Sequence, residues 1–271
     1  MPSFNASNSR SPLSPPRAGR FVSMRLATVC LIAVVAIGAT ASIVIAATDP
    51  DWSGTAPREI SQSGTDEARQ PAIAVNPPSQ VVAVWRDRPF GESCYDIYAA
   101  HSNDQGRSWL PPARVSESSA RSQLPDIATG QGTVFVAWAE ENTVSTPTTF
   151  KIYETELGST SQPRLIPIPD ADAPSDISTG PRLATSLDRM HVVFNAGFNA
   201  GQDGSHIFHG SRAFTEDSWP TATQVYGSAG AWSLFPALAV RADGQAEDLH
   251  LVWEKVTLDS SGRQRNVLYM R

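Results

Sequence analysis

The sequence is poor in cysteine and in charged side chains, and each shortage excludes a class of protein. Only two cysteines are present, and Cys30 lies in an apolar run, which leaves Cys94 alone in the rest of the chain. An intrachain disulfide framework is therefore excluded there. Charged residues make up 18% of the chain, and the net charge is −6. Because an acidic surface repels phosphates, we expect no nucleic-acid partner.

The sequence also lacks a grouping of residues that would hold a metal ion. His206 and His209 are three apart in an expected strand, so their side chains point to opposite faces. His191 and His250 share one position of the repeat described below, which favours a structural role. Asp104 has no second acid in its own turn that would complete a calcium site. We expect neither a metal nor another cofactor.

The N-terminal part of the chain has the pattern of an exported protein. Residues 1–25 carry four arginines and no acid, and we expect them to be disordered. Residues 26–47 form an uncharged run long enough to cross a bilayer as a helix. Because positive flanks stay on the cytoplasmic side, the chain after this run is expected outside the cell.

Two alternatives for this segment stay open. It is either an uncleaved membrane anchor or a signal peptide that is cleaved after the small residues 39–41. The protein is accordingly expected at the cell membrane with an extracellular domain, or secreted. A linker at residues 48–57 leads into the remainder of the chain.

Residues 58–271 contain four copies of one strand pattern. Each copy opens with a proline and a short apolar strand, and these prolines recur at an interval of about 55 residues. The prolines are Pro71, Pro125, Pro181 and Pro236. A second strand then ends on an aromatic side chain, and a third strand follows a variable loop. Four short strands in each copy, with many glycines and prolines between them, are typical of β-propeller blades.

The aromatic residues at the ends of the second strands carry a further prediction. They are Trp85, Trp138, Phe194 and Trp253. Because they recur in register, we expect them to fill the core between blades. A fourth strand is visible at Arg114 in the first copy and at Gln224 in the third. Residues 58–61 match the segment at Arg114 and indicate one more fourth strand, with no blade of its own before it.

The turn between the third and fourth strands of the first copy has the sequence SNDQGRSW, from Ser102 to Trp109. An Asp-x-Gly sequence between two strands predicts a hairpin turn. The Asp104 carboxylate can accept backbone N–H bonds within the turn, and Gly106 can adopt the positive φ that the turn needs. Trp109 can cover the apolar side of the hairpin.

The pattern Ser-x-Asp-x-Gly-x-x-Trp resembles the Asp-box, or BNR repeat, of exported sialidase-like β-propellers. The resemblance implies an all-β propeller in which the box lies on an outer turn, away from the active centre. It also implies a ring of six blades, of which this chain shows four recognisable ones. A closed ring of four blades, completed by residues 58–61, is the alternative.

Several polar residues are expected to meet on one face of the propeller, because the loops after the second strands and the starts of the innermost strands gather near the central channel. The candidates for ligand binding are Arg86, Arg88, Asp126, Glu140, Arg182 and Glu254. Arginines can hold the carboxylate of a sugar acid in a bidentate fork. In the alternative interpretation, the segment 86–88 is only a solvated, ion-paired loop.

The resemblance to sialidases implies a more specific site. Those enzymes hold the substrate carboxylate with three arginines and use an acid/base Asp with a Tyr nucleophile that a Glu assists. Asp87, in the loop before the hairpin with the box, is the candidate for the catalytic acid. The Arg-Ile-Pro motif of the family's first arginine is absent, and the sequence identifies no Tyr–Glu pair.

Two functions follow from these observations. In the first, the chain is a non-catalytic module that binds a glycan, such as a sugar acid, or another protein. In the second, it is an exo-α-sialidase-type glycoside hydrolase that is incomplete in this chain. We favour the first function and expect no sialidase turnover.

Overall fold

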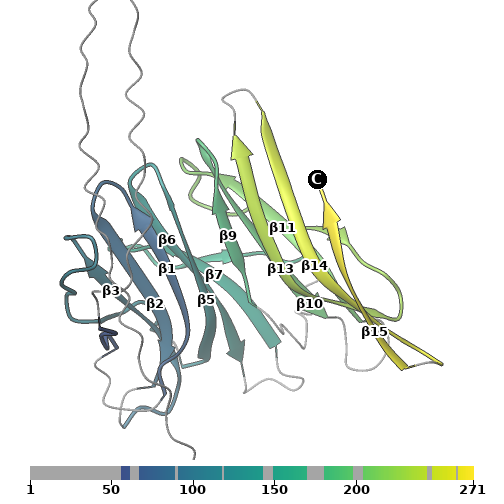
Figure 1. Cartoon of the computed structure of the whole chain (residues 1–271), viewed down its shortest axis with the longest axis horizontal. Coiled ribbons are helices and arrows are strands. Elements are labelled where there is room, and N and C mark those ends of the chain that lie inside the picture. Colours follow the sequence, from purple (N-terminus) through teal and green to yellow (C-terminus); the bar gives the residue numbers. More distant parts are fainter. Residues whose placement is uncertain are drawn as a thin grey trace, which may run out of the picture. The chain divides into compact units, whose positions relative to one another are not determined.

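The computed structural model describes residues 56–61, 67–88, 91–117, 119–142, 149–169, 180–197, 204–242, 246–260 and 262–271. All regular elements among them are β-strands (Figure 1). The basic segment 1–25, the hydrophobic run 26–47 and most of the linker lie outside the described residues. In the part of the chain that the structure describes, no helix is long and apolar enough to cross a membrane.

The first two sequence copies each form one antiparallel sheet of four strands, which we call strand sets 1 and 2. Set 1 contains β1 (Arg69–Asn76), β2 (Gln80–Asp87), β3 (Asp96–Ser102) and β4 (Ala113–Arg114). Set 2 contains β5 (Arg121–Gly130), β6 (Thr133–Asn142), β7 (Thr149–Glu156) and β8 (Arg164–Ile166). The short strand β8 was not evident in the sequence.

The third and fourth copies are joined into one larger sheet. Set 3 contains β9 (Arg182–Thr185), β10 (Arg189–Gly197), β11 (Gly204–Ala213) and β12 (Thr223–Tyr226). Set 4 contains β13 (Ala231–Ala242), β14 (Glu247–Asp259) and β15 (Gly262–Met270). A short parallel pairing of β11 with β13, from Gly204 and Ser205 to Ala231 and Trp232, connects the two sets.

The innermost strands β1, β5, β9 and β13 lie next to one another in chain order (Figure 1). Apolar side chains fill the space between successive sets, and Trp138, Phe194 and Trp253 belong to this core. Trp85 packs instead with Ile60 and Trp109 in a separate cluster of set 1. The exposed fractions are 4% for Trp85, 1% for Trp138, 0% for Phe194 and 3% for Trp253, so all four aromatics are buried, and three of them fill the space between sets as predicted.

The same hydrogen bonds recur between neighbouring sets. The Thr129 hydroxyl donates to the carbonyl of Val75 at 3.0 Å, and the Thr185 hydroxyl donates to the carbonyl of Thr129 at 2.7 Å. Next to these contacts, the side-chain amide of Asn76 donates to the Gly132 backbone carbonyl, and the side-chain amide of Gln131 donates to the Leu187 backbone carbonyl. The sequence repeat therefore corresponds to a repeated contact in space.

The backbone has a positive φ at the residue before each of the four repeat prolines, within β1, β5 and β13 and just before β9. These φ angles are 56° at Gln70, 56° at Leu124, 66° at Gly180 and 52° at Phe235. In β1, β5 and β13 the strand register shifts at the same place, which is the mark of a β-bulge. The bulges contact one another, because the Leu124 N–H donates to the Gln70 side chain at 2.8 Å.

Residues 58–61 do not form the strand that the sequence predicted. Ile60 nevertheless packs on Ala83, Trp85 and Ala100 of set 1, as an apolar side chain of a fourth strand would. Val115 of set 1 packs in a similar way within the core shared by sets 1 and 2.

Candidate functional site

The loop face of set 1 brings together side chains from four separate segments around Tyr95. This residue directly precedes β3, and it lies near the ends of β2 and β3 because Asp87 pairs with Asp96 there. The Tyr95 hydroxyl donates a hydrogen bond to Oε2 of Glu67 at 2.8 Å. The other oxygen of Glu67 accepts a hydrogen bond from Arg88 at 3.0 Å.

Three guanidinium groups converge on the Tyr95 ring. Their Cζ atoms lie 4.2 Å from the ring centroid for Arg86, 5.0 Å for Arg88 and 5.8 Å for Arg121. Arg121 begins β5, so the group joins two strand sets. Cation–π attraction offsets part of the repulsion between the three like charges. We call Glu67, Arg69, Arg86, Arg88, Tyr95 and Arg121 the Tyr95 cluster.

Positive charge exceeds negative charge in the Tyr95 cluster and its ion-pair partners. Glu67 pairs with Arg88 and, at 3.8 Å, with Arg69, while Arg121 pairs with Glu141 at 3.3 Å. The Tyr95 hydrogen bond lowers the pKa of Glu67, so this residue is a carboxylate at neutral pH. Burial lowers the pKa of Arg86, whose guanidinium stays charged because its ordinary pKa is so high.

Asp87, the candidate acid, is buried at the end of β2 with 1% exposure. Its carboxylate accepts a hydrogen bond from the Trp85 indole at 3.1 Å and from the Arg88 backbone N–H at 2.7 Å. These bonds hold the carboxylate against the strand end and orient the loop that carries Arg88.

The other predicted ligand-binding residues are spread over the remaining sets. Asp126 accepts a hydrogen bond from the Leu183 backbone N–H at 2.7 Å and so links β5 to β9. Burial raises the pKa of Asp126, and the positive charge of Arg182 opposes that rise. Glu140 lies in β6 directly before Glu141, which pairs with Arg121. Glu254 pairs with Arg265 at 2.6 Å, within set 4. Of the six candidates, only Arg86 and Arg88 belong to the Tyr95 cluster.

The turn after β3 is held by its own side chains. Asp104 accepts hydrogen bonds from the Ser102 hydroxyl at 2.7 Å, from the Ser108 N–H at 2.8 Å and from the Ser108 hydroxyl at 2.6 Å. Gly106 has a φ of +85°, and its N–H donates to the Ser102 hydroxyl at 2.8 Å. Trp109 packs on the Ala83–Trp85–Ala100 core.

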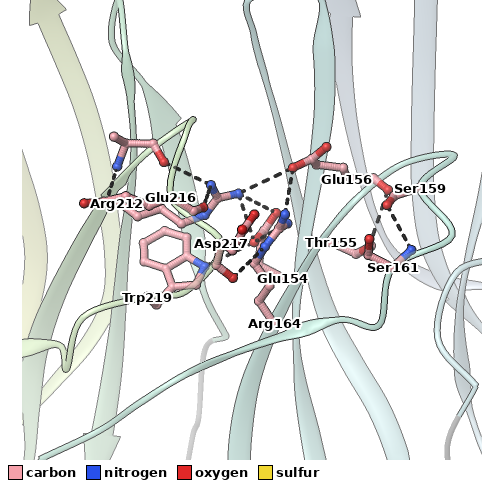
Figure 2. A network of polar contacts seen from close by, with 11 residues as sticks. Glu154, Thr155, Glu156, Ser159, Ser161, Arg164, Arg212, Glu216, Asp217 and Trp219 are labelled. Atoms are coloured by element: carbon pink, nitrogen blue, oxygen red, sulfur yellow. Dashed lines mark hydrogen bonds and ion pairs between the residues drawn. The ribbon is translucent and has the colours of Figure 1, made fainter.

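A second polar cluster is enclosed between sets 2 and 3 (Figure 2). Glu154 and Arg212 are both 0% exposed and form an ion pair at 3.2 Å. Trp219 donates its indole N–H to Glu154 at 3.1 Å, and Arg164 lies 3.6 Å from the same carboxylate. Arg164 also donates to Glu156 at 3.0 Å. Because its central pair is fully buried, this cluster joins the two sets and offers no access to a ligand.

His206 and His209, three residues apart in β11, contact different partners, as their expected placement on opposite faces predicts. Nδ1 of His191 lies 3.3 Å from Nε2 of His209, and Nε2 of His191 lies 3.4 Å from Glu247. His206 contacts Gln224 instead. Among the described residues, no group of three histidine, cysteine or acidic side chains is placed to hold a metal ion.

Sequence reasoning missed Glu67, Tyr95 and Arg121 as parts of one site. Glu67 precedes β1, and Arg121 opens the next strand set, so nothing in the local sequence connects either residue with Tyr95. The one available signal was the position of Tyr95 in the loop after the second strand, where ligand-binding residues were expected.

No protein-family model and no curated protein matches the chain. Solved structures do match it. An α-L-arabinofuranosidase from Lactobacillus brevis aligns at a TM-score of 0.51 and 14% identity, over 76% of this chain and 74% of that one. An α-L-arabinanase from Penicillium chrysogenum, complexed with arabinobiose, aligns at 0.51 and 13%, over 75% and 62%. A sialidase from Trypanosoma rangeli aligns at 0.51 and 13%, over 75% of this chain and 36% of the sialidase.

The fold is that of a sialidase-like β-propeller. This confirms the predicted all-β propeller architecture. The chain spans about three fifths of the arabinanase and about a third of the sialidase. At such low identity, the likeness concerns the fold alone. It assigns no role to the residues of the Tyr95 cluster.

Proposed function

We propose that the chain is an exported or membrane-anchored, non-catalytic β-propeller that binds an acidic glycan through the Tyr95 cluster. The observation that carries this proposal is the convergence of three guanidinium groups on the Tyr95 ring, within 4.2–5.8 Å of its centroid. A carboxylate of a sugar acid matches a guanidinium in charge and can take two parallel hydrogen bonds from it.

The charge and exposure of the cluster support an anionic ligand. Three arginines pair with the carboxylates of Glu67 and Glu141, and Arg86 adds a fourth positive charge, on a chain whose net charge is −6. A local positive patch on an acidic protein concentrates anions at that patch. Arg88 and Arg121 keep 39% and 46% of their side-chain surface exposed, so a ligand can reach them.

Two further observations support the assignment to glycans. The hydrogen-bonded turn from Ser102 to Trp109 has the residues of an Asp-box, which we assign here as a structural turn outside the binding face. Among the matching propellers, one structure is a sialidase and another is an arabinanase that contains arabinobiose. Asp126, Glu140, Arg182 and Glu254 remain predicted ligand contacts.

The binding test uses 3′-sialyllactose and lactose as a matched acidic and neutral pair, titrated calorimetrically into the full chain in detergent. We expect only the acidic sugar to bind, and Arg86→Gln to weaken its binding about tenfold, because a hydrogen bond to a charged group is lost. Arg107→Gln removes the same charge from the exposed turn and is the control. Equal binding of both sugars, or equal loss in both variants, would contradict the proposal.

A hydrolase is the second candidate function, and the hydrogen bond between Tyr95 and Glu67 favours it. A carboxylate that accepts the tyrosine proton could activate the tyrosine oxygen as a nucleophile. The non-catalytic function remains preferred, because the one candidate acid, Asp87, is buried and already accepts two hydrogen bonds.

A fluorogenic sialoside separates the two functions. We expect no turnover above the blank. Turnover that disappears in Tyr95→Phe and persists in Arg107→Gln would replace the binding module with the hydrolase.

Export is tested separately with a C-terminal protease-sensitive tag on intact, wall-stripped cells. We expect the protease to remove the tag from outside, because the arginines before residues 26–47 stay in the cytoplasm. A tag that is protected until the cells are lysed would refute this orientation.

A further inference from the structure

Arg86 is the arginine of the Tyr95 cluster whose side chain has the fewest partners within the chain. Its Nε atom is buried and has no hydrogen-bond partner among the described residues, and its Nη1 atom reaches Gln123 only at 3.5 Å. The carboxylates that pair with arginines of the cluster, Glu67 and Glu141, are not paired with Arg86. Because a buried donor without a partner costs free energy, Nε of Arg86 is a donor that a ligand anion can satisfy.

Glu67 holds its carboxylate in the same cluster much as a bound ligand would. Its Oε2 atom accepts a hydrogen bond from the Tyr95 hydroxyl at 2.8 Å, and its Oε1 atom accepts one from Arg88 at 3.0 Å. The ring of Tyr95 lies under the Arg86 guanidinium, with 4.2 Å between Cζ and the ring centroid. The two donors that Glu67 uses are therefore next to the unsatisfied Nε of Arg86, and both suit the carboxylate of a sugar acid.

The Glu67 side chain is free to leave these donors. It keeps 25% of its surface exposed, so one side of the carboxylate already faces solvent. Glu67 also precedes β1, which begins at Arg69, and lies outside the hydrogen-bonded ladder of that strand. Rotation about its own side-chain bonds moves the carboxylate into water without a change in the sheet.

We propose that Glu67 is a built-in competitor for the ligand, and that a carboxylate of the acidic glycan displaces it from Tyr95 and Arg88. This inference rests on the proposed function, because it concerns how the same site takes its ligand. The incoming carboxylate takes over both donors and adds the Nε of Arg86, which Glu67 leaves without a partner. Glu67, once displaced, is hydrated as an exposed carboxylate.

Displacement makes Glu67 a residue that sets specificity. A neutral sugar offers no charge to the two donors and leaves Glu67 in place. A sugar carboxylate has the planar, two-oxygen geometry of the group that it replaces. The affinity of the unaltered chain is reduced, because only the fraction of molecules in which Glu67 has turned away is competent to bind. A residue that merely supported the arginines would act in the opposite direction, since its loss would weaken binding.

The test compares the Kd of 3′-sialyllactose for the full chain in detergent with the Kd for Glu67→Gln, measured calorimetrically. We expect Glu67→Gln to bind about five- to tenfold more tightly, because the ligand no longer has to break an ion pair and a charged hydrogen bond. Glu67→Asp keeps the negative charge but is one methylene shorter, so its carboxylate falls short of the Tyr95 hydroxyl. This variant should also bind more tightly.

Glu92→Gln is the matched control. It removes the same charge from the exposed loop that leads to Tyr95, and no ion pair joins Glu92 to a described residue. Because salt screens the field of an exposed charge, this variant should change the Kd by less than about twofold. Thermal unfolding of each variant verifies that the compared chains are folded.

The possible results separate this inference from the proposed function. If the unaltered chain binds the acidic sugar and Glu67→Gln binds it equally or more weakly, displacement is wrong and the binding module stands. Tightening that Glu92→Gln reproduces, or that Glu67→Asp lacks, would also overturn displacement, since the charge alone would then account for it. Binding that is detectable only in Glu67→Gln supports both proposals, and no binding by any of the chains refutes both.

Discussion

Tyr95 donates a hydrogen bond from its side-chain hydroxyl to Glu67 across 2.8 Å, although 28 residues separate the two in the chain. This bond places an ionised carboxylate beside Arg88 and Arg69 and so keeps part of the positive charge of the Tyr95 cluster compensated. The hydrogen bonds and ion pairs of the cluster hold its arginines, and Arg88 and Arg121 are exposed enough for an anion to approach them.

The first prediction concerns the carboxylate in this bond. Tyr95→Phe removes the hydroxyl that contributes most to lowering the pKa of Glu67, so that pKa should rise toward its ordinary value. A titration followed by carboxyl carbon NMR measures it. An unchanged Glu67 pKa in Tyr95→Phe would show that the arginines alone hold the carboxylate ionised.

The second prediction concerns the turn after β3. Hydrogen bonds from Ser108 and then Ser102 lower the pKa of Asp104 strongly. Its stabilising effect is therefore complete above the ordinary pKa of 3.8 and is lost as the pH falls toward the lowered value of the folded state. Asp104→Asn should lower the melting temperature at pH 7, and the difference from the unaltered chain should shrink steadily as the pH falls below 3.8. Sugar binding should be unchanged, since the turn lies outside the Tyr95 cluster.

The third prediction concerns the buried ion pair of Glu154 and Arg212. Arg212→Met leaves the buried Glu154 carboxylate with Arg164, 3.6 Å away, as its one remaining ion-pair partner among the described residues, and should cost up to about 3–5 kcal/mol of unfolding free energy. The double variant Arg212→Met, Glu154→Leu should recover much of that loss, because the buried carboxylate is removed and Arg164 keeps its pair with Glu156. Denaturant unfolding of the single and double variants measures the difference. Equal stability of the two would refute the role of an unpaired charge.

The fourth prediction separates backbone strain from crowding at two glycines. Gly180 has a φ of +66°, and an added Cβ would lie 2.4 Å from Cβ of Leu124. Gly158 has a φ of +85° with nothing within 4 Å of such an atom. Gly158→Ala should cost about 1–2 kcal/mol from the left-handed backbone alone. Gly180→Ala should cost more, as measured by thermal or denaturant unfolding, because the neighbouring bulge must also move.

The fifth prediction concerns the paired histidines. Burial, and then the neighbouring His191, lower the pKa of His209 to about 4 from the ordinary 6.5. The unfolded chain therefore binds a proton at a higher pH than the folded chain, and stability should fall as the pH drops from about 6.5 to about 4. His209→Gln should flatten this part of the stability profile. An unchanged slope would place the titration at another group.

Local and periodic features of this protein were determined by the sequence itself. The turn from Ser102 to Trp109 forms from residues that are neighbours in the chain, so its hydrogen bonds could be anticipated from residue types. The buried aromatic positions could be predicted because they recur with the strand pattern, and periodicity survives in a linear sequence. The all-β propeller fold followed from that repeat and was confirmed.

Only the tertiary structure decided which distant residues meet. Glu67, Tyr95 and Arg121 come from different segments, and their proximity depends on the packing of set 1 against set 2. Residues 58–61 have a strand-like sequence but pair with no described strand, and a strand forms only where a neighbouring strand accepts its hydrogen bonds.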